Sequence, residues 1–355
     1  MPPALPWTVR LEDDKVVLID QTALPEQLRF VECRDVECVA RAIETMVVRG
    51  APAIGATAAY GLALAAMTSP SKDAGGLMRD LEAAAERLRR TRPTAVNLFW
   101  AIERVMAAAR SASESGDAGE IRRAVVSEAE RIAQEDVEAN RAIGRHGARL
   151  IEDGMTVMTI CNAGTLATVW YGTVTAPIYT AWDEGKRFSV IALETRPVLQ
   201  GARLTAYELH AAGIPVTLIV DGAAAHTIRE KGVDLILVGA DRILRDGTVY
   251  NKIGTYSLAL AARAHGVPFF SVAPTSTFDL ESSRSDVRIE ERRPEEVTTV
   301  RGVRIAPEGI DVYNPAFDMT PPHLLTGIVT ERGILYQPLR LSIARAFKAS
   351  AAAGH

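Results

Sequence analysis

The chain has 355 residues, of which 48% are hydrophobic and 24% charged, so it is long enough to bury one large core or, as we expect, two smaller ones. Its net charge of -4 is spread without long single-sign runs, which argues against a broad electrostatic surface for nucleic acid or an anionic membrane. Its three cysteines match neither a disulfide framework nor a zinc ribbon, and we expect free thiols in a reducing cytosol.

Neither a secretion signal nor a membrane span is predicted. Residues 1–10 are rich in proline and lead into acidic residues, without the basic and apolar regions of a leader. The longest apolar stretch, residues 51–67, is mostly alanine and is broken by Pro52, Gly55 and Gly61, so we expect a buried helix there. A cytoplasmic protein is the expectation.

Residues 1–150 are predicted to form a helical N-terminal domain with a small β flap. Short β-like runs at Trp7–Leu11, Lys15–Ile19 and Leu28–Glu32 indicate an antiparallel flap. From Asp35, a candidate N-cap, the spacing becomes helical. The apolar stripes are Val36, Val39, Ile43, Met46 and Val47; Leu77, Leu81, Ala84 and Leu88; Val96, Phe99, Ile102 and Met106; and Ile121, Val125 and Ile132.

Residues 151–355 are predicted to form a Rossmann-like, doubly wound parallel-sheet domain, which makes the fold class α/β. Apolar runs without polar alternation indicate parallel strands covered on both faces, and their spacing permits crossover helices. The runs are Thr156–Ile160, Phe188–Leu193, Val216–Val220, Leu235–Val238 and Pro268–Val272. No glycine-rich dinucleotide or P-loop motif follows any of them, which argues against both of those enzyme classes.

Ligands of such sheets bind beyond the carboxyl ends of the strands, so the residues after each run are candidates for function. They are Cys161 and Asn162, Glu194–Arg196, Asp221, Asp241 and Pro274–Thr277. Cys161 is expected to stand before a helix, whose dipole would favour the thiolate, although a free cysteine is more often a small buried apolar residue. Cys33 and Cys38 receive that second interpretation.

Asp241 is expected to project from a strand end into the cleft, where burial would keep its carboxyl group neutral as a general acid. The alternative is a residue that caps the next helix. Asn251 and Lys252 are expected to open a helix, where phosphate binding and simple capping are both plausible. Gln200 offers an amide that could bind a sugar hydroxyl group, but alone it decides nothing.

Two arginines precede predicted helices. Arg49 stands before the small residues of Arg49–Gly55, where backbone and a helix N-terminus could approach a phosphate. The alternative is a plain helix-helix turn with a solvated arginine. Arg92, before Pro93 and Thr94, is a weaker case that alone favours a helix-terminal charge. The six histidines lack metal-ligand spacing, and no nucleophile elbow of a serine hydrolase occurs.

Together, several segments resemble the methylthioribose-1-phosphate isomerase family, which is related to ribose-1,5-bisphosphate isomerase and the regulatory subunits of translation initiation factor 2B. The match spans nearly the whole chain, and the joint occurrence of the segments in this order is highly specific. The segments are Arg49–Gly55, Cys161–Gly164, Glu194–Pro197, Gln200–Thr205, Val238–Arg242, Asn251–Thr255, Asn314–Asp318 and Thr320–Pro322.

The resemblance implies a homodimer without a cofactor that isomerises 5-methylthioribose 1-phosphate to 5-methylthioribulose 1-phosphate in methionine salvage. It implies Cys161 and Asp241 as the catalytic pair. The substrate-binding positions that it implies are Arg49, Gly50, Ala51, Arg92, Gln200, Asn251 and Lys252. Three alternatives stay open, namely action on 5-deoxyribose 1-phosphate, a ribose-1,5-bisphosphate isomerase and a non-catalytic regulatory protein. The substrate stays open because 5-methylthioribose 1-phosphate, 5-deoxyribose 1-phosphate and ribose 1,5-bisphosphate differ only at C5.

Overall fold

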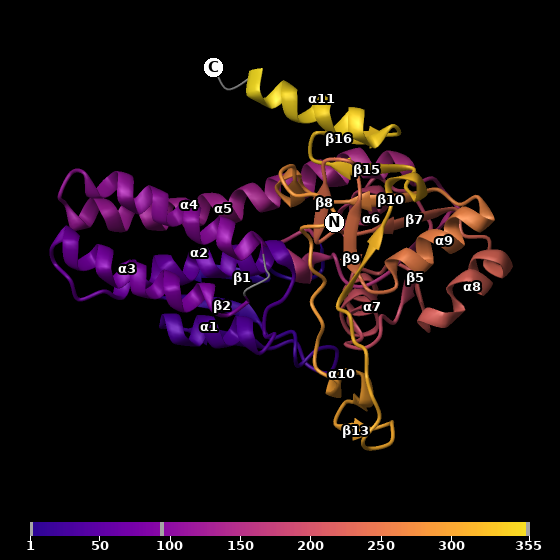
Figure 1. Cartoon of the computed structure of the whole chain (residues 1–355), viewed down its shortest axis with the longest axis horizontal. Coiled ribbons are helices and arrows are strands. Elements are labelled where there is room, and N and C mark those ends of the chain that lie inside the picture. The colour runs from indigo at the N-terminus through magenta and orange to yellow at the C-terminus, as the bar shows by residue number, and fades with distance from the viewer. Residues whose placement is uncertain (1–2, 93–95, 353–355) are drawn as a thin grey trace. The chain divides into compact units, whose positions relative to one another are not determined.

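The computed structural model describes residues 3–92 and 96–352, with the side chains of 349–352 left aside. Two compact units make up this part of the chain (Figure 1). The helical unit comprises residues 5–140 and 164–172, and the α/β unit comprises the described residues of 1–4, 141–163 and 173–355. The helical unit therefore stops short of residue 150 and takes in a later segment of chain as well.

The helical unit opens with the predicted three-stranded antiparallel flap. Its strands are β1 (Val9–Glu12), β2 (Lys15–Ile19) and β3 (Phe30–Cys33), with β2 in the middle. The central strand is almost wholly buried, because its apolar run packs on the helices while both edges pair with a neighbour.

Five described helices follow the flap, where the four stripes and the apolar stretch 51–67 predict them (Figure 1). They are α1 (Val36–Glu44), α2 (Ala51–Thr68), α3 (Ala74–Arg89), α4 (Val96–Ser113) and α5 (Ala118–Gly147). Asp35 caps α1 as predicted, since its carboxylate accepts the N–H of Cys38 at 2.7 Å. Helix α2 is the one described helix that is long and apolar enough to cross a membrane, but 78% of it is buried inside the protein, as expected for a core helix.

Helix α4 buries half of the predicted stripe, Ile102 and Met106, and exposes the other half. Val96 and Phe99 are 45% and 38% exposed, whereas Leu98 and Val105 are fully buried beside Ile102. Both stripes have helical spacing, so the sequence of α4 alone cannot choose between them. The choice is made by α2 and α3, which pack against the Leu98 face.

Cys33 and Cys38 form a disulfide bond, which corrects the expectation of free thiols. Cys33 ends β3 and Cys38 lies in the first turn of α1, with 5.3 Å between their Cα atoms. The strand-to-helix corner at Asp35 brings the pair together. Spacing along the sequence does not reveal such a corner, so the pairing was missed.

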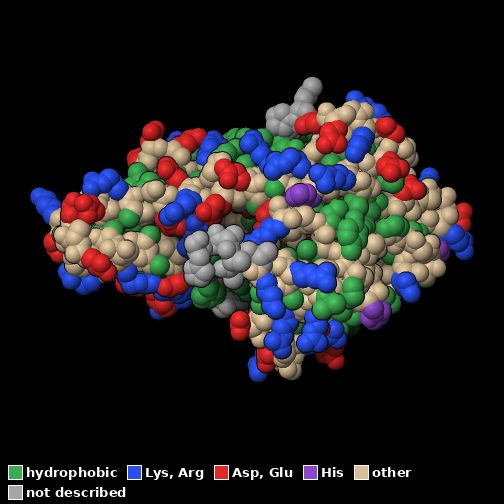
Figure 2. Space-filling view, turned by 90° about the horizontal axis from the view of Figure 1, so that it is seen from above, with side chains coloured by type: hydrophobic (Ala, Val, Ile, Leu, Met, Phe, Trp, Pro, Cys, Tyr) green, Lys and Arg blue, Asp and Glu red, His purple; other side chains and the backbone are tan. Residues whose placement is uncertain are grey.

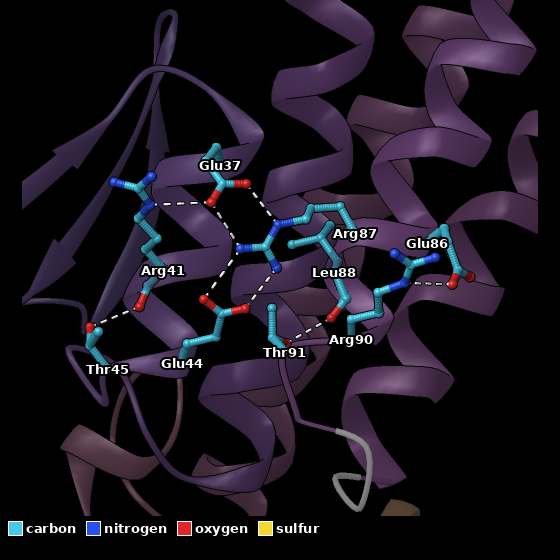
Figure 3. Close-up of polar contacts among 9 residues, drawn as sticks. All are labelled: Glu37, Arg41, Glu44, Thr45, Glu86, Arg87, Leu88, Arg90 and Thr91. Atoms are coloured by element: carbon cyan, nitrogen blue, oxygen red, sulfur yellow. Dashed lines mark hydrogen bonds and ion pairs between the residues drawn. The ribbon is translucent and has the colours of Figure 1, made fainter.

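Charges of both signs are interspersed on the face that Figure 2 displays. Ion pairs also connect helices within the helical unit. Arg87 of α3 binds Glu37 and Glu44 of α1 at 2.7 Å each (Figure 3). The hydrogen bond from Arg87 lowers the pKa of Glu37 to about 2, with Arg41 adding to the effect. The pair is solvated, so it orients the two helices more than it stabilises them.

The segment Gly164–Gly172, which we call the strap, packs within the helical unit. The Gln21 amide donates to the Leu166 carbonyl at 2.7 Å, and the Val169 N–H donates to the Asp136 carboxylate at 2.7 Å. Burial raises the pKa of Asp136 to about 7, even though it accepts this hydrogen bond. The strap is thus anchored by side chains from the flap and from α5.

The α/β unit is built on the predicted doubly wound sheet. The order across the sheet is β16-β15-β10-β7-β4-β5-β6, and each pair is parallel except β15 with β16. The strands are β4 (Thr156–Thr159), β5 (Ser189–Leu193), β6 (Val216–Ile219), β7 (Leu235–Val238), β10 (Phe269–Val272), β15 (Gly327–Thr330) and β16 (Gly333–Tyr336). Without β16, this is the strand order of a Rossmann fold, which confirms the fold prediction.

The crossovers of the α/β unit carry helices, but the edge strand is less covered than predicted. The helices are α6 (Thr175–Asp183), α7 (Ala206–Ala211), α8 (Ala224–Lys231), α9 (Thr255–His265) and α11 (Leu339–Ala352), with a single turn at α10 (Glu295–Thr298). Leu218 of β6 is 49% exposed, since an edge strand has a neighbour on one side only. The expected burial of both faces therefore holds for the inner strands and is wrong for β6.

A second sheet, which the sequence analysis missed, follows β7. It contains β11 (Phe278–Asp279), β8 (Arg242–Leu244), β9 (Val249–Lys252) and β14 (Phe317–Thr320) in that order, and β12 (Thr299–Val300) pairs separately with β13 (Val303–Arg304). Strands β8 and β9 form a hairpin whose turn contains Asp246 and Gly247. An Asp-Gly pair between apolar residues is a recognised hairpin signal, so this element could have been predicted.

Candidate active site

The strand order creates a switch point between β4 and β7. From β4 the chain winds outward through β5 and β6, and then returns to place β7 on the other side of β4. Ligands of open α/β sheets bind beyond the carboxyl ends of the strands at this kind of point. Cys161 follows β4 and Asp241 follows β7, so the topology brings the predicted catalytic pair to one place in the α/β unit.

Close packing at Gly239 shows that three of the predicted segments meet there. A Cβ atom on this residue would lie 2.7 Å from the Cβ atom of Ala163 and 3.8 Å from Oδ1 of Asn251. Glycine therefore lets the chain before Asp241 approach the chain after Cys161. The segments of Cys161, Asp241 and Asn251 are neighbours, although nearly ninety residues separate the first from the last.

Cys161 is half-buried and has a φ of 64°, a conformation that costs a non-glycine residue free energy. Its N–H donates to Oγ1 of Thr195 at 2.8 Å, and its carbonyl accepts from Oγ1 of Thr205 at 2.6 Å. No helix starts behind it, which corrects the expectation. A short 3₁₀ turn at Thr165–Ala167 comes next, and α6 begins only at Thr175, so the helix-dipole argument for a thiolate has no basis here.

The loop after β5 is strained in the same way and is held by Asp221. Thr195 has a φ of 66°. Its N–H and that of Arg196 both donate to the Asp221 carboxylate, at 2.8 and 2.6 Å. Asp221, predicted at the ligand edge, therefore anchors this loop. Glu194 directly precedes Thr195 in this loop. Burial raises the pKa of Glu194, and the nearby charge of Asp221 adds to the effect.

Gln200 lies at the start of a π-helical turn, Gly201–Thr205, between β5 and α7. The residue is only 7% exposed, and its Oε1 atom has no hydrogen-bond partner among the described residues. Leaving a buried amide oxygen without a donor costs about 1–3 kcal/mol. This oxygen is therefore suited to accept a hydrogen bond from a ligand.

Asp241 is exposed, which corrects the expectation that its carboxyl group is buried. Its N–H donates to the Tyr250 carbonyl at 2.9 Å, at the mouth of the β8-β9 hairpin. Because a strand and not a helix follows it, the helix-capping alternative is excluded. Asp241 is thus an exposed residue at the sheet edge, and its backbone is fixed by the hairpin.

Asn251 and Lys252 end strand β9 and do not open a helix, as had been expected. Asn251 is buried and donates to Oγ1 of Thr255 at 3.0 Å, while Nζ of Lys252 lies 4.8 Å from the centre of the Phe317 ring. This contact holds the ammonium group by a cation–π interaction. The amide of Asn251 thus lies near Gly239, and the ammonium group of Lys252 lies over Phe317.

Asp318, which the sequence analysis gave no role, caps the helix behind this pair. Its carboxylate accepts the N–H groups of Gly254 at 2.7 Å and Tyr256 at 3.1 Å. Burial raises its pKa to about 6, against these hydrogen bonds and the charge of Lys252. Asp318 pairs with Asn251 across β14 and β9, a relation that only the unrecognised second sheet provides.

The remaining predicted residues belong to the helical unit. Arg49 and Gly50 precede α2, which begins at Ala51. Gly50 has a φ of 98°, and a Cβ atom on it would lie 2.4 Å from the Cα atom of Ala167 in the strap, so only glycine fits. The backbone before α2 is therefore fixed by close contact with the strap.

Arg92 follows the last turn of α3, where the Thr91 hydroxyl donates to the Leu88 carbonyl at 2.7 Å (Figure 3). Pro93 and Thr94 lie outside the described residues. A Cβ atom on Gly55 of α2 would lie 3.0 Å from the carbonyl oxygen of Asn97 in the first turn of α4. The starts of α2 and α4 are thus adjacent, and helix N-termini favour anions.

Among the described residues, no group of three or more His, Cys, Asp and Glu side chains could hold a metal ion.

Residues 47–337 match the sequence profile of the initiation factor 2 subunit family. The chain belongs to that family. Its recognition from the order of the eight segments is thereby confirmed.

Curated members of the family and solved structures match nearly the whole chain. Methylthioribose-1-phosphate isomerase of Geobacillus thermodenitrificans (strain NG80-2) is 51% identical over 334 residues, which are 94% of this chain and 93% of the relative. That of Desulfitobacterium hafniense (strain Y51) is 50% identical over 96% of this chain and 97% of the relative.

The crystal structure of 5-methylthioribose 1-phosphate isomerase from Pyrococcus horikoshii OT3 has a TM-score of 0.93 at 48% identity, and covers 98% of each chain. A structure named translation initiation factor eIF-2B, subunit delta, from A. fulgidus has a TM-score of 0.88 at 47% identity, and covers 96% of this chain and 99% of its own.

Proposed function

We propose that this family member is an aldose–ketose isomerase that converts 5-methylthioribose 1-phosphate to 5-methylthioribulose 1-phosphate in methionine salvage. The observation that carries the proposal is the position of Cys161 and Asp241 at the switch point between β4 and β7. The names of relatives at about half identity support the substrate. A thiol and a carboxyl group at the carboxyl ends of two neighbouring strands suit acid–base chemistry on a small ligand.

The first step of such a reaction must open a sugar ring whose anomeric carbon carries a phosphate ester, which blocks spontaneous opening. In our proposal Asp241 donates a proton to the ring oxygen as the C1–O4 bond breaks, a contribution of about 10²- to 10⁴-fold. Because the carboxyl group is exposed without substrate, its neutral form needs another cause. The bound phosphate dianion and the loss of water on binding both favour protonation.

The second step moves hydrogen from C2 to C1. Either Cys161 carries a proton between the two carbons, or a hydride shifts directly in a site without water. Turnover in deuterium oxide separates these routes: label at C1 supports transfer through an exchangeable group, and its absence supports a hydride shift or a fully shielded proton. On both routes the O2 hydroxyl group loses its proton as the ketone forms, which replaces the proton that Asp241 gave to the ring oxygen. The product then has the composition of the substrate, so the balance needs no redox cofactor.

We assign substrate binding to the predicted set of residues. The phosphate would be held by Arg49, Arg92 and Lys252 with the backbone at Gly50 and Ala51, since a dianion removed from water needs paired charge. The adjacent helix starts in the helical unit support this role. Asn251 and Gln200 would bind sugar hydroxyl groups, and the unpartnered Oε1 atom of Gln200 supports that assignment.

We also propose a cytoplasmic homodimer. Sedimentation of the purified protein tests the dimer.

The Cys33–Cys38 disulfide weighs against a fully reducing location. Trapping thiols with a maleimide during cell lysis, followed by mass measurement, tests this point: three labelled cysteines fit a reducing cytosol, and one labelled cysteine shows that the disulfide forms in the cell.

A non-catalytic regulatory role is the second candidate, because a relative at 47% identity is named as an initiation factor subunit. A direct assay without added cofactor separates the candidates by offering 5-methylthioribose 1-phosphate, 5-deoxyribose 1-phosphate and ribose 1,5-bisphosphate, with the Cys161→Ser variant as control. Preference for the first supports our proposal, and equal use of the first two extends it. Preference for the bisphosphate would reassign the substrate, and activity on none would favour the regulatory role.

A further inference from the structure

Glu208 of α7 is a fully buried carboxyl group that the proposed mechanism does not use. It accepts hydrogen bonds from the Asn162 amide and, at 2.9 Å, from the Tyr179 hydroxyl. Both partners are also buried. Because Glu208 has no access to solvent, it cannot touch a substrate, and any role in catalysis must act through the groups around it.

A chain of hydrogen bonds leads from Glu208 to Cys161. The Asn162 amide nitrogen donates to Glu208 and also, at 3.1 Å, to Oγ1 of Thr205. The Thr205 hydroxyl in turn donates its proton to the Cys161 carbonyl at 2.6 Å. Because Oε1 of Glu208 accepts an N–H group of the Asn162 side chain, it fixes which end of the Asn162 amide faces it. The hydroxyl oxygen of Thr205 then accepts a hydrogen bond from Asn162, and the single hydroxyl proton is directed to the Cys161 carbonyl.

The strained conformation of Cys161 makes this chain of bonds matter. A positive φ at a non-glycine residue persists only where the surroundings over-determine it, and costs about 1–3 kcal/mol. Water cannot replace a lost partner, because Asn162, Thr205 and Glu208 are each at most 2% exposed. We propose that Glu208 is a positioning residue, which holds Cys161 in its strained conformation by orienting Asn162 and Thr205. This inference rests on the proposed function, in which Cys161 is catalytic.

The test compares substitutions on the two sides of Glu208. Glu208→Leu removes the acceptor for Asn162, and we expect kcat to fall about 100-fold with little change in KM, as for a misplaced catalytic group. Glu208→Gln keeps an oxygen for Asn162 and should restore most of kcat. Tyr179→Phe removes the hydrogen bond from Tyr179 to Glu208 but leaves the bond from Asn162 in place, and so should stay close to the wild type. Full kcat in Glu208→Leu, or an equal loss in all three variants, would overturn the proposal.

Thr205→Val removes the hydroxyl group next to Cys161 without a change of charge, and decides the question if Glu208→Leu does not fold. Thr205→Val should reproduce the loss of kcat, whereas Thr205→Ser should retain the activity. A fully active Thr205→Val variant would contradict the positioning role. A second readout does not depend on turnover. Alkylation of Cys161 by iodoacetamide should become faster by about fivefold or more in Glu208→Leu, because a released loop exposes the half-buried thiol.

The alkylation measurement also separates this inference from the proposed function. Wild-type protein without isomerase activity would refute the function, but the contrast in thiol reactivity between Glu208→Leu and Glu208→Gln would still report on positioning. Cys161→Ser gives the background, since Cys33 and Cys38 are paired. Equal alkylation rates in the wild type and both Glu208 variants would refute the positioning role.

Discussion

In the helical unit the chain before α2 is shaped by the packing of small residues, whereas in the α/β unit the chain after β4 is shaped by side-chain hydrogen bonds. Gly50 touches the backbone of Ala167 so closely that no side chain fits. Cys161, by contrast, is held in a strained conformation by Thr195 and Thr205.

The difference indicates how each unit should respond to substitution. A site that depends on close packing is damaged by added atoms, and a site held by buried hydrogen bonds is damaged by lost ones. The proposed roles differ as well, with the chemistry in the α/β unit and two of the three phosphate-binding cations, Arg49 and Arg92, in the helical unit. Four experiments test this division, two on activity and then two on stability, and within each kind the larger expected effect comes first.

The largest effect is expected from Asp241→Asn in the α/β unit. Loss of the proposed acid should lower kcat by about 10²- to 10⁴-fold, because the amide cannot protonate the ring oxygen. KM should change little, since the side chain keeps its shape. Steady-state kinetics measure both constants, with Asp311→Asn, another exposed aspartate of this unit, as the matched control. Normal turnover of the Asp241 variant would end the acid assignment.

Arg92→Ala in the helical unit should act on binding. Loss of a charge-assisted contact to phosphate is worth about 1.5–3 kcal/mol, so KM should rise about 10- to 100-fold while kcat changes less. Arg90→Ala is the control, since this neighbour is exposed and pairs with Glu86 (Figure 3). An unchanged KM for the Arg92 variant would contradict its role in binding.

Gly50→Ala tests the packing of the helical unit. Its φ of 98° and the contact with Ala167 should together lower the free energy of unfolding by more than about 3 kcal/mol. Gly116→Ala is matched, because Gly116 has a φ of 75° with nothing within 4 Å, and should cost only about 1–2 kcal/mol. Denaturant unfolding compares the two, and equal losses would mean that strain alone acts at Gly50.

Arg87→Met should give the smallest effect, a decrease in Tm of about 2 °C or less at pH 7. The pKa of Glu37 is lowered to about 2 in the folded protein, against an ordinary value of 4.5. The stabilisation is therefore present above pH 4.5 and is lost as the pH falls toward 2. Thermal scans from pH 7 to pH 3 should show the two proteins converge, and a difference that grows at low pH would rule out this ion pair as its source.

Local features of the fold were predictable because neighbouring residues determine them. The cap at Asp35 and the stripe from Leu77 to Leu88 depend on spacing within one helix, and both were found. The continuous apolar runs gave the inner strands of the sheet and therefore the positions of Cys161 and Asp241 at its edge. The fold class and the place of the candidate catalytic pair thus follow from the sequence.

What the sequence could not supply depends on contacts between distant segments. The link from Glu208 to Cys161 joins positions more than forty residues apart, and nothing near Glu208 in the sequence marks it. The exposure of Asp241 depends on the hairpin after it, whose Asp-Gly turn was present but went unrecognised. The positions of Asn251 and Lys252 likewise depend on the pairing of β9 with β14.

The strap has a consequence for how the protein is made. Residues 5–140 leave the ribosome first, but their unit still lacks the segment that accepts the amide of Gln21 and donates to Asp136. Domains usually fold during synthesis from the N-terminus onward. Here the first unit is completed only when Gly172 has been added, after the central strand β4 of the other unit. The two units are therefore interleaved in translation, and a helical fragment that ends at residue 140 would lack part of its own structure.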